Sequence, residues 1–258
     1  MLRAETITLP HGTPWNVLTD GEGPLLVWLH GLRRVEPDDL VLCELARHFR
    51  VVAPLAPGFV DPADLDRLDD IHDVALAYDD LFAALGAPVR LLVGHSLGAM
   101  YAAEAAAHVP VRAERLALLA PFGLWADDEP VTDIFAVPAA DLDNLLWADE
   151  KARAARARTP AGDLGEGLVE AARDLRAAAK FLWPIPDKGL RKRLRRITIP
   201  TLAIFGERDA VIPASYAQTF AHALPSSRTE VLPGAGHMMP LEQPEAIIQR
   251  LLRHAGLA

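Results

Sequence analysis

Short apolar segments alternate with longer segments of helical pattern along most of this sequence. The apolar segments predict β-strands, and the longer ones predict helices that cross from one strand to the next. The runs LLVWL at residues 25–29 and TLAIF at residues 201–205 are hydrophobic without alternation, which is typical of strands covered on both faces. The pattern therefore predicts an α/β chain with a mostly parallel sheet. We expect strands at Thr6–Leu9, Trp15–Thr19, Leu25–Leu29, Val51–Ala53, Arg90–Val93, Arg115–Leu119, Thr201–Phe205 and Thr229–Leu232, and helices at Asp38–His48, Ile71–Leu85, Leu97–His108, Ser215–Ala223 and Pro244–Ala255.

One long stretch interrupts this alternation, from about Phe122 to Arg196. A structureless loop of this length is implausible within a compact domain, so we expect a small helical unit inserted in the sheet. This divides the chain into a core domain, residues 1–121 and 197–258, and a helical insertion or cap, residues 122–196. The expected helices of the insertion are Pro138–Ala148, Asp149–Arg158, Leu164–Phe181 and Asp187–Arg196, and we interpret the basic run from Lys188 to Arg196 as a solvated helix end.

The segment GHSLG, residues 94–98, carries the pattern G-x-S-x-G between an expected strand and an expected helix. A sharp strand-to-helix turn exposes a serine hydroxyl at the end of a sheet, and the two glycines relieve crowding where the chain returns close to itself. A serine hydroxyl needs a neighbouring base to become a nucleophile. Ser96 is therefore our candidate nucleophile.

The base is expected to be a histidine oriented by a carboxylate, in the chain order serine, acid, histidine. His237 follows an expected strand within the glycine-rich segment LPGAGH, and Asp209 follows another within GERD. Loops at strand ends are where open α/β sheets present catalytic groups. Glu207 competes for the acid role, but we prefer Asp209 because it lies deeper in the loop, and we expect Glu207 to face solvent or pair with Arg208.

Acyl transfer also needs donors for the oxyanion of the tetrahedral intermediate. The backbone N–H of Leu97, which follows the nucleophile at a helix N-terminus, is one candidate. The second is the backbone N–H of Leu32, in the loop after the third expected strand. His30, in the same loop, is interpreted as a structural residue that braces it.

The charge and cysteine content exclude several classes of protein. The formal net charge is −9, with 26 basic and 35 acidic residues, which argues against a nucleic-acid partner. Cys43 is the one cysteine, so a disulfide within the chain and a cysteine-built metal site are excluded. The apolar runs are far shorter than the roughly 20 residues of a membrane span. Because a signal peptide is also not visible, we expect a cytoplasmic protein. The sequence leaves open whether it is a monomer or a homodimer.

Taken together, these motifs resemble the α/β-hydrolase superfamily over nearly the whole chain: His30-Gly31 in the oxyanion loop, GHSLG, GERD, and GAGHMMPLEQPE around the histidine. The resemblance implies an eight-stranded, mostly parallel sheet with helices on both faces, a helical cap over the active site, and no cofactor or metal. Ser96 differs from the aspartate used by the dehalogenase and epoxide-hydrolase branches. Leu32-Arg33-Arg34 stands where many relatives have further glycines.

We expect a serine hydrolase that cleaves small to medium apolar carboxylic esters through an acyl-enzyme. One alternative is a hydrolase that breaks carbon–carbon bonds of dienoate meta-cleavage products, with Arg33 or Arg34 holding the substrate carboxylate. Another is a small-molecule receptor with a vestigial triad. The residues expected to line the substrate pocket are Arg33, Met100, Trp125, Phe135, Trp147, Trp183 and Met238.

Overall fold

The computed structural model describes residues 1–109, 113–156, 164–186, 188–224 and 226–257. Its centre is an eight-stranded sheet with the strand order β1-β2-β4-β3-β5-β6-β7-β8. Strand β2 pairs antiparallel with both β1 and β4, and the remaining neighbours pair parallel. The predicted mostly parallel sheet is confirmed. The strands are β1 (Arg3–Thr8), β2 (Pro14–Asp20), β3 (Leu25–Leu29), β4 (Arg50–Pro54), β5 (Val89–His95), β6 (Leu116–Leu119), β7 (Thr201–Gly206) and β8 (Ser227–Leu232).

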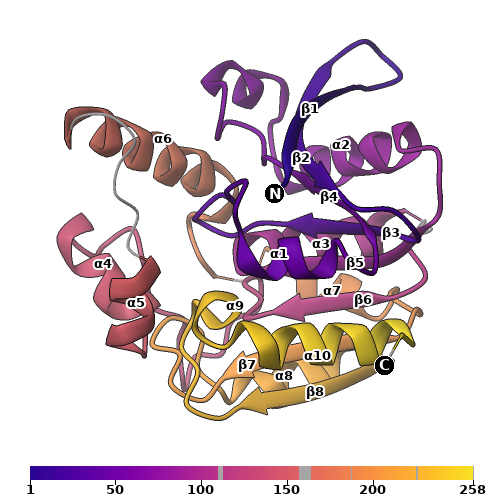
Figure 1. Ribbon diagram of the computed structural model, residues 1–258. Coiled ribbons are helices and arrows are strands. Elements are labelled where there is room, and N and C mark those ends of the chain that lie inside the picture. Colours follow the sequence, from indigo (N-terminus) through magenta and orange to yellow (C-terminus); the bar gives the residue numbers. More distant parts are fainter. Residues whose placement is uncertain (110–112, 157–163, 187, 225, 258) are drawn as a thin grey trace.

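Helices cover both faces of the sheet, as Figure 1 shows. On one face lie α1 (Leu40–Leu45), α9 (Met239–Glu242) and α10 (Pro244–Ala255), and on the other lie α2 (Ile71–Ala84), α3 (Leu97–His108) and α8 (Tyr216–Ala223). Successive strand side chains point to opposite faces, so Leu26 packs with the first group and Val27 with the second. Strands β3 and β7 are buried along their whole length, which explains their unbroken apolar runs.

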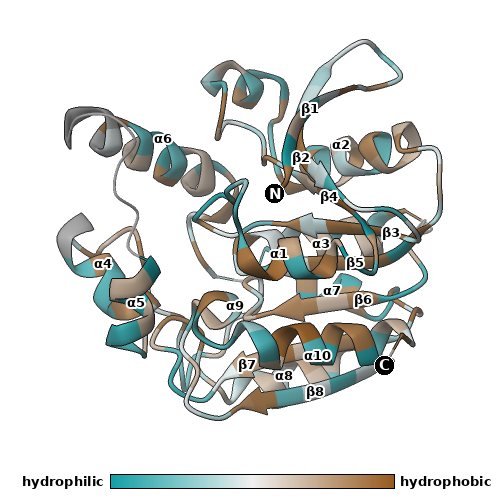
Figure 2. Ribbon diagram, in the orientation of Figure 1, coloured by the Kyte–Doolittle hydropathy of each residue, from teal (hydrophilic) through white to brown (hydrophobic). Residues whose placement is uncertain are grey.

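The outer elements keep a mixture of apolar and polar residues. Helix α10 buries Ile247, Leu251 and Ala255 against the sheet, and Figure 2 shows hydrophilic residues on its other side. Strand β1 is exposed along most of its length because it lies at the sheet edge. The amphipathic pattern of α10 and the polar pattern of β1 therefore follow from their positions in the layers.

Among the described residues, four helices lie between β6 and β7 in the sequence: α4 (Ala139–Leu146), α5 (Glu150–Arg156), α6 (Leu164–Leu182) and α7 (Leu190–Leu194). In Figure 1, α4, α5 and α6 lie beyond the carboxyl end of β6, away from the sheet, while α7 lies close to α3. The expected helix at 149–158 extends past the described residues. Two short elements escaped the sequence analysis, the 3₁₀ helix η1 (Pro62–Arg67) and α9, because each is too short for a periodic pattern.

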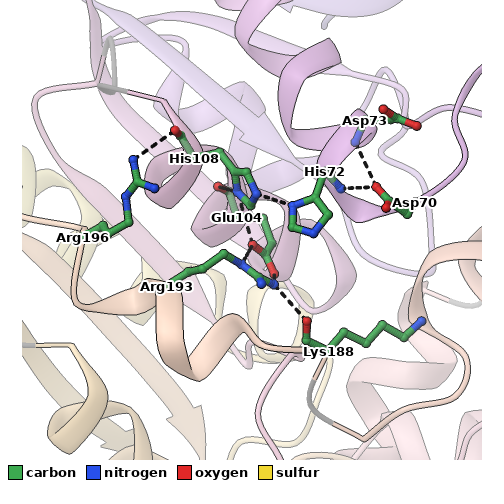
Figure 3. Close-up of polar contacts among 8 residues, drawn as sticks. All are labelled: Asp70, His72, Asp73, Glu104, His108, Lys188, Arg193 and Arg196. Carbon is green, nitrogen blue, oxygen red and sulfur yellow. Dashed lines mark hydrogen bonds and ion pairs between the residues drawn. The ribbon is translucent and has the colours of Figure 1, made fainter.

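A partly buried ion pair joins α3 to α7 (Figure 3). The carboxylate of Glu104 is 1% exposed and accepts hydrogen bonds from Arg193 Nε at 2.7 Å and Nη2 at 2.6 Å. His108, one turn further along α3, contacts Glu104 through its own Nδ1 and meets His72 of α2 through Nε2. The interpretation of the basic run as a solvated helix end is therefore wrong at Arg193, since its guanidinium anchors α7 to the helix that follows Ser96.

Candidate active site

Ser96 lies on the turn between β5 and α3, with φ 57° and ψ −118°. A residue with a side chain in this left-handed region is strained by on the order of 1–3 kcal/mol, and such strain must be held by surrounding contacts. The N–H of Ser96 donates to the carbonyl of Leu119 on β6 at 2.8 Å, and its own carbonyl accepts from Ala99 and Met100 in the first turn of α3. The turn is thereby fixed from both sides.

The two glycines around Ser96 are required by different neighbouring atoms. A Cβ at Gly94 would lie 2.4 Å from the carbonyl oxygen of Gly98, so this glycine permits the return of the chain on itself. A Cβ at Gly98 would instead lie 2.1 Å from the carbonyl oxygen of Leu29 and 2.4 Å from that of His30. Gly98 is therefore required by the end of β3 rather than by the turn alone, which the local sequence did not reveal.

His237 follows β8, and its imidazole contacts both of the other predicted residues. Its Nε2 lies 2.8 Å from Ser96 Oγ, and its Nδ1 lies 2.9 Å from Asp209 Oδ2. Because a carboxylate accepts hydrogen bonds, Nδ1 carries the proton and Nε2 is left to accept the hydroxyl proton of Ser96. The three residues are 1%, 1% and 8% exposed for Ser96, His237 and Asp209, so this chain of hydrogen bonds is shielded from water.

Asp209 is held by its own loop after β7. Its Oδ1 accepts hydrogen bonds from the N–H groups of Val211 at 2.8 Å and Ile212 at 2.9 Å, which leaves Oδ2 directed to His237. Glu207 lies elsewhere: its Oε2 accepts from the N–H of Gly234 at 2.8 Å. Of the two competing carboxylates, Asp209 contacts the imidazole, whereas Glu207 is exposed, as one of the two expectations had it, and binds the glycine-rich turn.

Two buried histidines brace the loops around the site. His30 donates from Nδ1 to the carbonyl of Gly31 at 2.8 Å and accepts from the N–H of Ala56 at Nε2 at 2.9 Å. His95 donates from Nε2 to the carbonyl of His237 at 2.8 Å. Burial lowers the pKa of His30 to about 4 and that of His95 to about 3, so both imidazoles are neutral near pH 7.

The two predicted oxyanion donors come from the start of α3 and from the loop after β3. Leu97 is the first residue of α3, where a backbone N–H has no partner within the helix. Leu32 lies in the loop after β3, and Gly31 in that loop is so close to Ser96 that a Cβ on it would lie 2.8 Å from Ser96 Cβ. This spacing brings the Leu32 loop beside the candidate nucleophile.

The next two residues of that loop reach the inserted helices. Arg33 pairs with Asp143 of α4. Arg34 donates from Nη2 to Asp174 of α6 at 2.7 Å and pairs through Nη1 with Glu170 at 2.9 Å. The two arginines therefore neutralise carboxylates of the insertion.

The residues expected to line a substrate pocket are dispersed. Arg33 and Trp147 share a hollow of about 610 Å³ with Arg34, Arg156 and Leu241, whereas Met100 borders a separate small cavity beside Gly123. Met238 is buried next to His237, and its N–H donates to the carbonyl of Leu146 at the end of α4. Trp125 and Phe135 are half-buried, and Trp183 is 57% exposed.

Two residues that contact the site were not singled out from the sequence. His95 lies inside the GHSLG motif, but its partner is a carbonyl 142 positions away. Glu242 lies inside the GAGHMMPLEQPE motif and binds the N–H groups of Gly236 and Ala148. The available signal was their position within the two motifs, His95 directly before Ser96 and Glu242 five residues after His237, but their partners depend on how distant segments meet.

Among the residues that the structure describes, no helix is long and apolar enough to cross a membrane. Within the same residues, no group of three or more histidine, cysteine, aspartate or glutamate side chains is arranged to hold a metal ion.

Comparison with known proteins gives consistent matches over most of the chain. A sequence profile described as the alpha/beta hydrolase family matches residues 26–250. The chain is 29% identical over 255 residues to a pimeloyl-[acyl-carrier protein] methyl ester esterase of Xanthomonas campestris pv. campestris, covering 90% of this chain and 95% of the relative. It is 27% identical to polyketide synthase ThaQ of Burkholderia thailandensis over 95% of this chain, but it spans 12% of that much longer protein.

A solved structure also matches in fold. The meta-cleavage product hydrolase from Pseudomonas fluorescens IP01 superimposes with a TM-score of 0.76 at 19% identity, covering 98% of this chain and 97% of that one. At this identity the likeness concerns the fold.

Proposed function

This chain belongs to the alpha/beta hydrolase family, and from that premise we propose that it is a serine hydrolase of small to medium apolar carboxylic esters. The observation that carries the proposal is the buried chain of hydrogen bonds from Ser96 through His237 to Asp209. This order of groups is the one that activates a serine hydroxyl. The methyl ester esterase, matched over nearly the full length of both proteins, supports an ester as the substrate.

In the proposed reaction, Ser96 Oγ attacks the ester carbonyl while His237 Nε2 takes the hydroxyl proton. Asp209 holds the imidazole in the required tautomer and stabilises its charged form. The N–H groups of Leu97 and Leu32 donate to the oxyanion, and each such donor typically contributes about 3 kcal/mol to lowering the barrier. His237 then protonates the leaving alcohol, and water hydrolyses the acyl-enzyme with His237 again as base.

We assign the insertion, residues 122–196, the role of a cap that closes over the substrate. The contact of Met238 with the carbonyl of Leu146 supports this role, because it joins the residue after His237 to the insertion. Trp147, which lines the same hollow as Arg33, and Met238, which directly follows His237, are the best supported of the pocket residues, whereas Met100 borders a separate cavity. Trp183 is the least supported, because more than half of it is exposed.

Cleavage of carbon–carbon bonds is less well supported than cleavage of esters. That alternative needs Arg33 or Arg34 to bind a substrate carboxylate, yet both guanidinium groups already pair with carboxylates of the insertion. A receptor without catalysis is also less well supported, since the hydroxyl, imidazole and carboxylate are all in contact.

The test compares Ser96→Ala with Ser215→Ala, whose hydroxyl is on an exposed residue at the start of α8. Turnover of p-nitrophenyl esters of graded acyl length and labelling by a fluorophosphonate are measured for both. We expect Ser96→Ala to lose both labelling and about 10⁴-fold or more of kcat, and Ser215→Ala to match the wild type. Undiminished ester turnover in Ser96→Ala would refute the mechanism, and fast turnover of vinylogous diketo acids without ester turnover would favour the carbon–carbon alternative.

A further inference from the structure

The carboxylate of Glu242 bridges the loop that carries His237 and the inserted segment. Its Oε2 accepts a hydrogen bond from the N–H of Gly236 at 2.7 Å, and its Oε1 accepts one from the N–H of Ala148 at 3.0 Å. Gly236 immediately precedes His237, and Ala148 follows α4 in the insertion. Each carboxylate oxygen therefore holds one of two backbones that are distant in the sequence.

These two backbones are in direct contact. A Cβ placed on Gly236 would lie 2.7 Å from the nitrogen of Ala148 and 2.8 Å from Glu242 Oε1. Such distances are shorter than those that real Cβ atoms make, so a larger residue at Gly236 would force the insertion away from the histidine loop. The carboxylate of Glu242 fills the remaining space beside this contact.

We propose that Glu242 is a positioning residue for the proposed reaction, because it fixes the His237 loop against Ala148 and so sets the approach of the imidazole to Ser96. The inference rests on the proposed function, in which His237 acts as the base. It adds that the contact between the insertion and the His237 loop also sets the position of the imidazole. Loss of the Glu242 bridge would leave Ser96, His237 and Asp209 chemically intact but less well aligned.

The chemistry of the bridge requires two acceptor oxygens. Burial raises the pKa of Glu242, while the hydrogen bonds from Gly236 and Ala148 act in the opposite direction and favour the carboxylate. A glutamine has one acceptor oxygen and one NH2 group, so it can satisfy one of the two N–H groups and must present a donor to the other. Glu242→Gln therefore keeps the size of the side chain and disrupts one half of the bridge.

The main experiment measures ester hydrolysis by Glu242→Gln and Glu242→Ala, with rates normalised to active sites by fluorophosphonate titration. Glu245→Gln is the matched control, because Glu245 is an exposed carboxylate three residues further along the chain. We expect kcat to fall roughly 10-fold in Glu242→Gln and roughly 100-fold in Glu242→Ala, in line with the cost of a misplaced catalytic group. KM is expected to stay within about 2-fold, because substrate contacts are unchanged.

A second measurement reports the histidine directly, without substrate. We expect the proton on His237 Nδ1, which is donated to Asp209, to give a downfield resonance in the proton NMR spectrum of the resting protein. We expect this resonance to shift or broaden in Glu242→Gln and to remain unchanged in Glu245→Gln. A residue that merely stabilised the fold would lower the melting temperature and leave both the resonance and kcat per active site unchanged.

The insertion side of the bridge is tested with Ala148→Pro, which removes the N–H that donates to Glu242 Oε1. Trp147 has φ −113° and ψ 129°, the extended conformation that a residue before proline adopts. We expect Ala148→Pro to lower kcat, and its effect to be less than multiplicative with that of Glu242→Gln, because both changes break the same bridge.

The outcomes separate this inference from the proposed function. If the wild-type protein neither hydrolyses esters nor reacts with a fluorophosphonate at Ser96, the proposed function fails, and the NMR comparison still tests whether Glu242 positions His237. If the wild type is active and Glu242→Gln retains wild-type kcat per active site and an unchanged resonance, the inference is overturned while the proposed function stands.

Discussion

The imidazole of His95 donates a hydrogen bond from Nε2 to the backbone carbonyl of His237 at 2.8 Å. His95 is covalently adjacent to Ser96, so the residue beside the candidate nucleophile also holds the backbone of the candidate base. Burial lowers the pKa of His95 to about 3, which keeps its imidazole neutral near pH 7. The contact is therefore insensitive to pH near neutrality.

Replacing His95 should reveal how much this contact contributes. In His95→Ala the buried carbonyl of His237 loses its donor, and we expect the free energy of unfolding to fall by about 1–3 kcal/mol. We also expect kcat for an ester to fall, because the base is less firmly held. His95→Gln, whose amide N–H can replace the donor, should recover part of both losses. Urea unfolding and steady-state kinetics provide the measurements, and equal kcat in the wild type and His95→Ala would argue against a role in positioning.

Asp209 and Glu207 can be distinguished by matched amide substitutions. Asp209→Asn presents an NH2 group or a neutral oxygen to His237 Nδ1, which disturbs the tautomer that catalysis needs, and we expect a loss of about 10⁴-fold in kcat. Glu207→Gln changes an exposed carboxylate that binds Gly234 N–H, and we expect near wild-type kcat. A larger loss in Glu207→Gln than in Asp209→Asn would reverse the assignment of the acid.

Gly98→Ala should damage the fold more than an alanine at an unconfined glycine. At Gly98 the Cβ would collide with the carbonyl oxygens of Leu29 and His30, whereas at Gly12, with φ 89°, the Cβ meets no atom within 4 Å. We expect Gly12→Ala to cost about 1–2 kcal/mol from backbone strain alone. Gly98→Ala should cost more and should also lower activity, because the displaced carbonyls belong to the end of β3 and the start of the loop that leads to Leu32. Similar thermal stability of the two variants would contradict this account.

Arg34→Met should test the link between the loop after β3 and α6. The side chains of Arg34 and Asp174 are 12% and 10% exposed, so removal of the guanidinium leaves a poorly solvated carboxylate, and we expect a loss of roughly 1–3 kcal/mol. The control is Arg47→Met, whose side chain is 72% exposed and pairs with Glu44, with an expected change of about 0–1 kcal/mol. Denaturant unfolding of both variants at two salt concentrations measures the difference.

Stability should fall as the pH is lowered from about 6.5 toward 4, in part because of His30. Its pKa is lowered from 6.5 to about 4 in the folded protein, so in this interval the unfolded chain binds more protons. Above pH 6.5 His30 is neutral in both states and does not lower the free energy of unfolding. By about pH 4 its protonation in the unfolded chain has lowered the free energy of unfolding by about 3 kcal/mol. Urea midpoints measured between pH 7.5 and 5 should decline less steeply in His30→Asn, but equally steeply in His48→Asn, an exposed control. Identical slopes in His30→Asn and the wild type would exclude His30 as a cause.

The strands and the main helices could be predicted because local pattern determines them. Apolar runs such as LLVWL mark strands buried on both faces, and an apolar stripe marks α10. The meeting of Ser96, Asp209 and His237 could also be anticipated, because each follows a strand of a parallel sheet and the carboxyl ends of such strands share one edge.

Contacts between segments that are distant in the sequence could not be predicted in the same way. Glu104 and Arg193 are far apart in the sequence, and neither periodicity nor composition pairs them. The requirement for glycine at position 98 comes from β3, and the partners of Glu242 depend on the path of the insertion. In each case the residue's partner comes from a distant segment that tertiary packing brings close, so the local sequence does not identify it.

The hydroxyl of Ser96 and the imidazole of His237 are separated by 141 positions and are carried by the loops after β5 and β8, with β6 and β7 between those strands. Any local unfolding that detaches β7 and β8 from β6 therefore separates His237 from Ser96, even if the first half of the sheet keeps its structure. In the proposed mechanism, the hydrolytic rate therefore reports whether the segment that begins with β7 is folded onto β6. Loss of hydrogen-exchange protection in β7 and β8 and loss of turnover should follow the same denaturant curve.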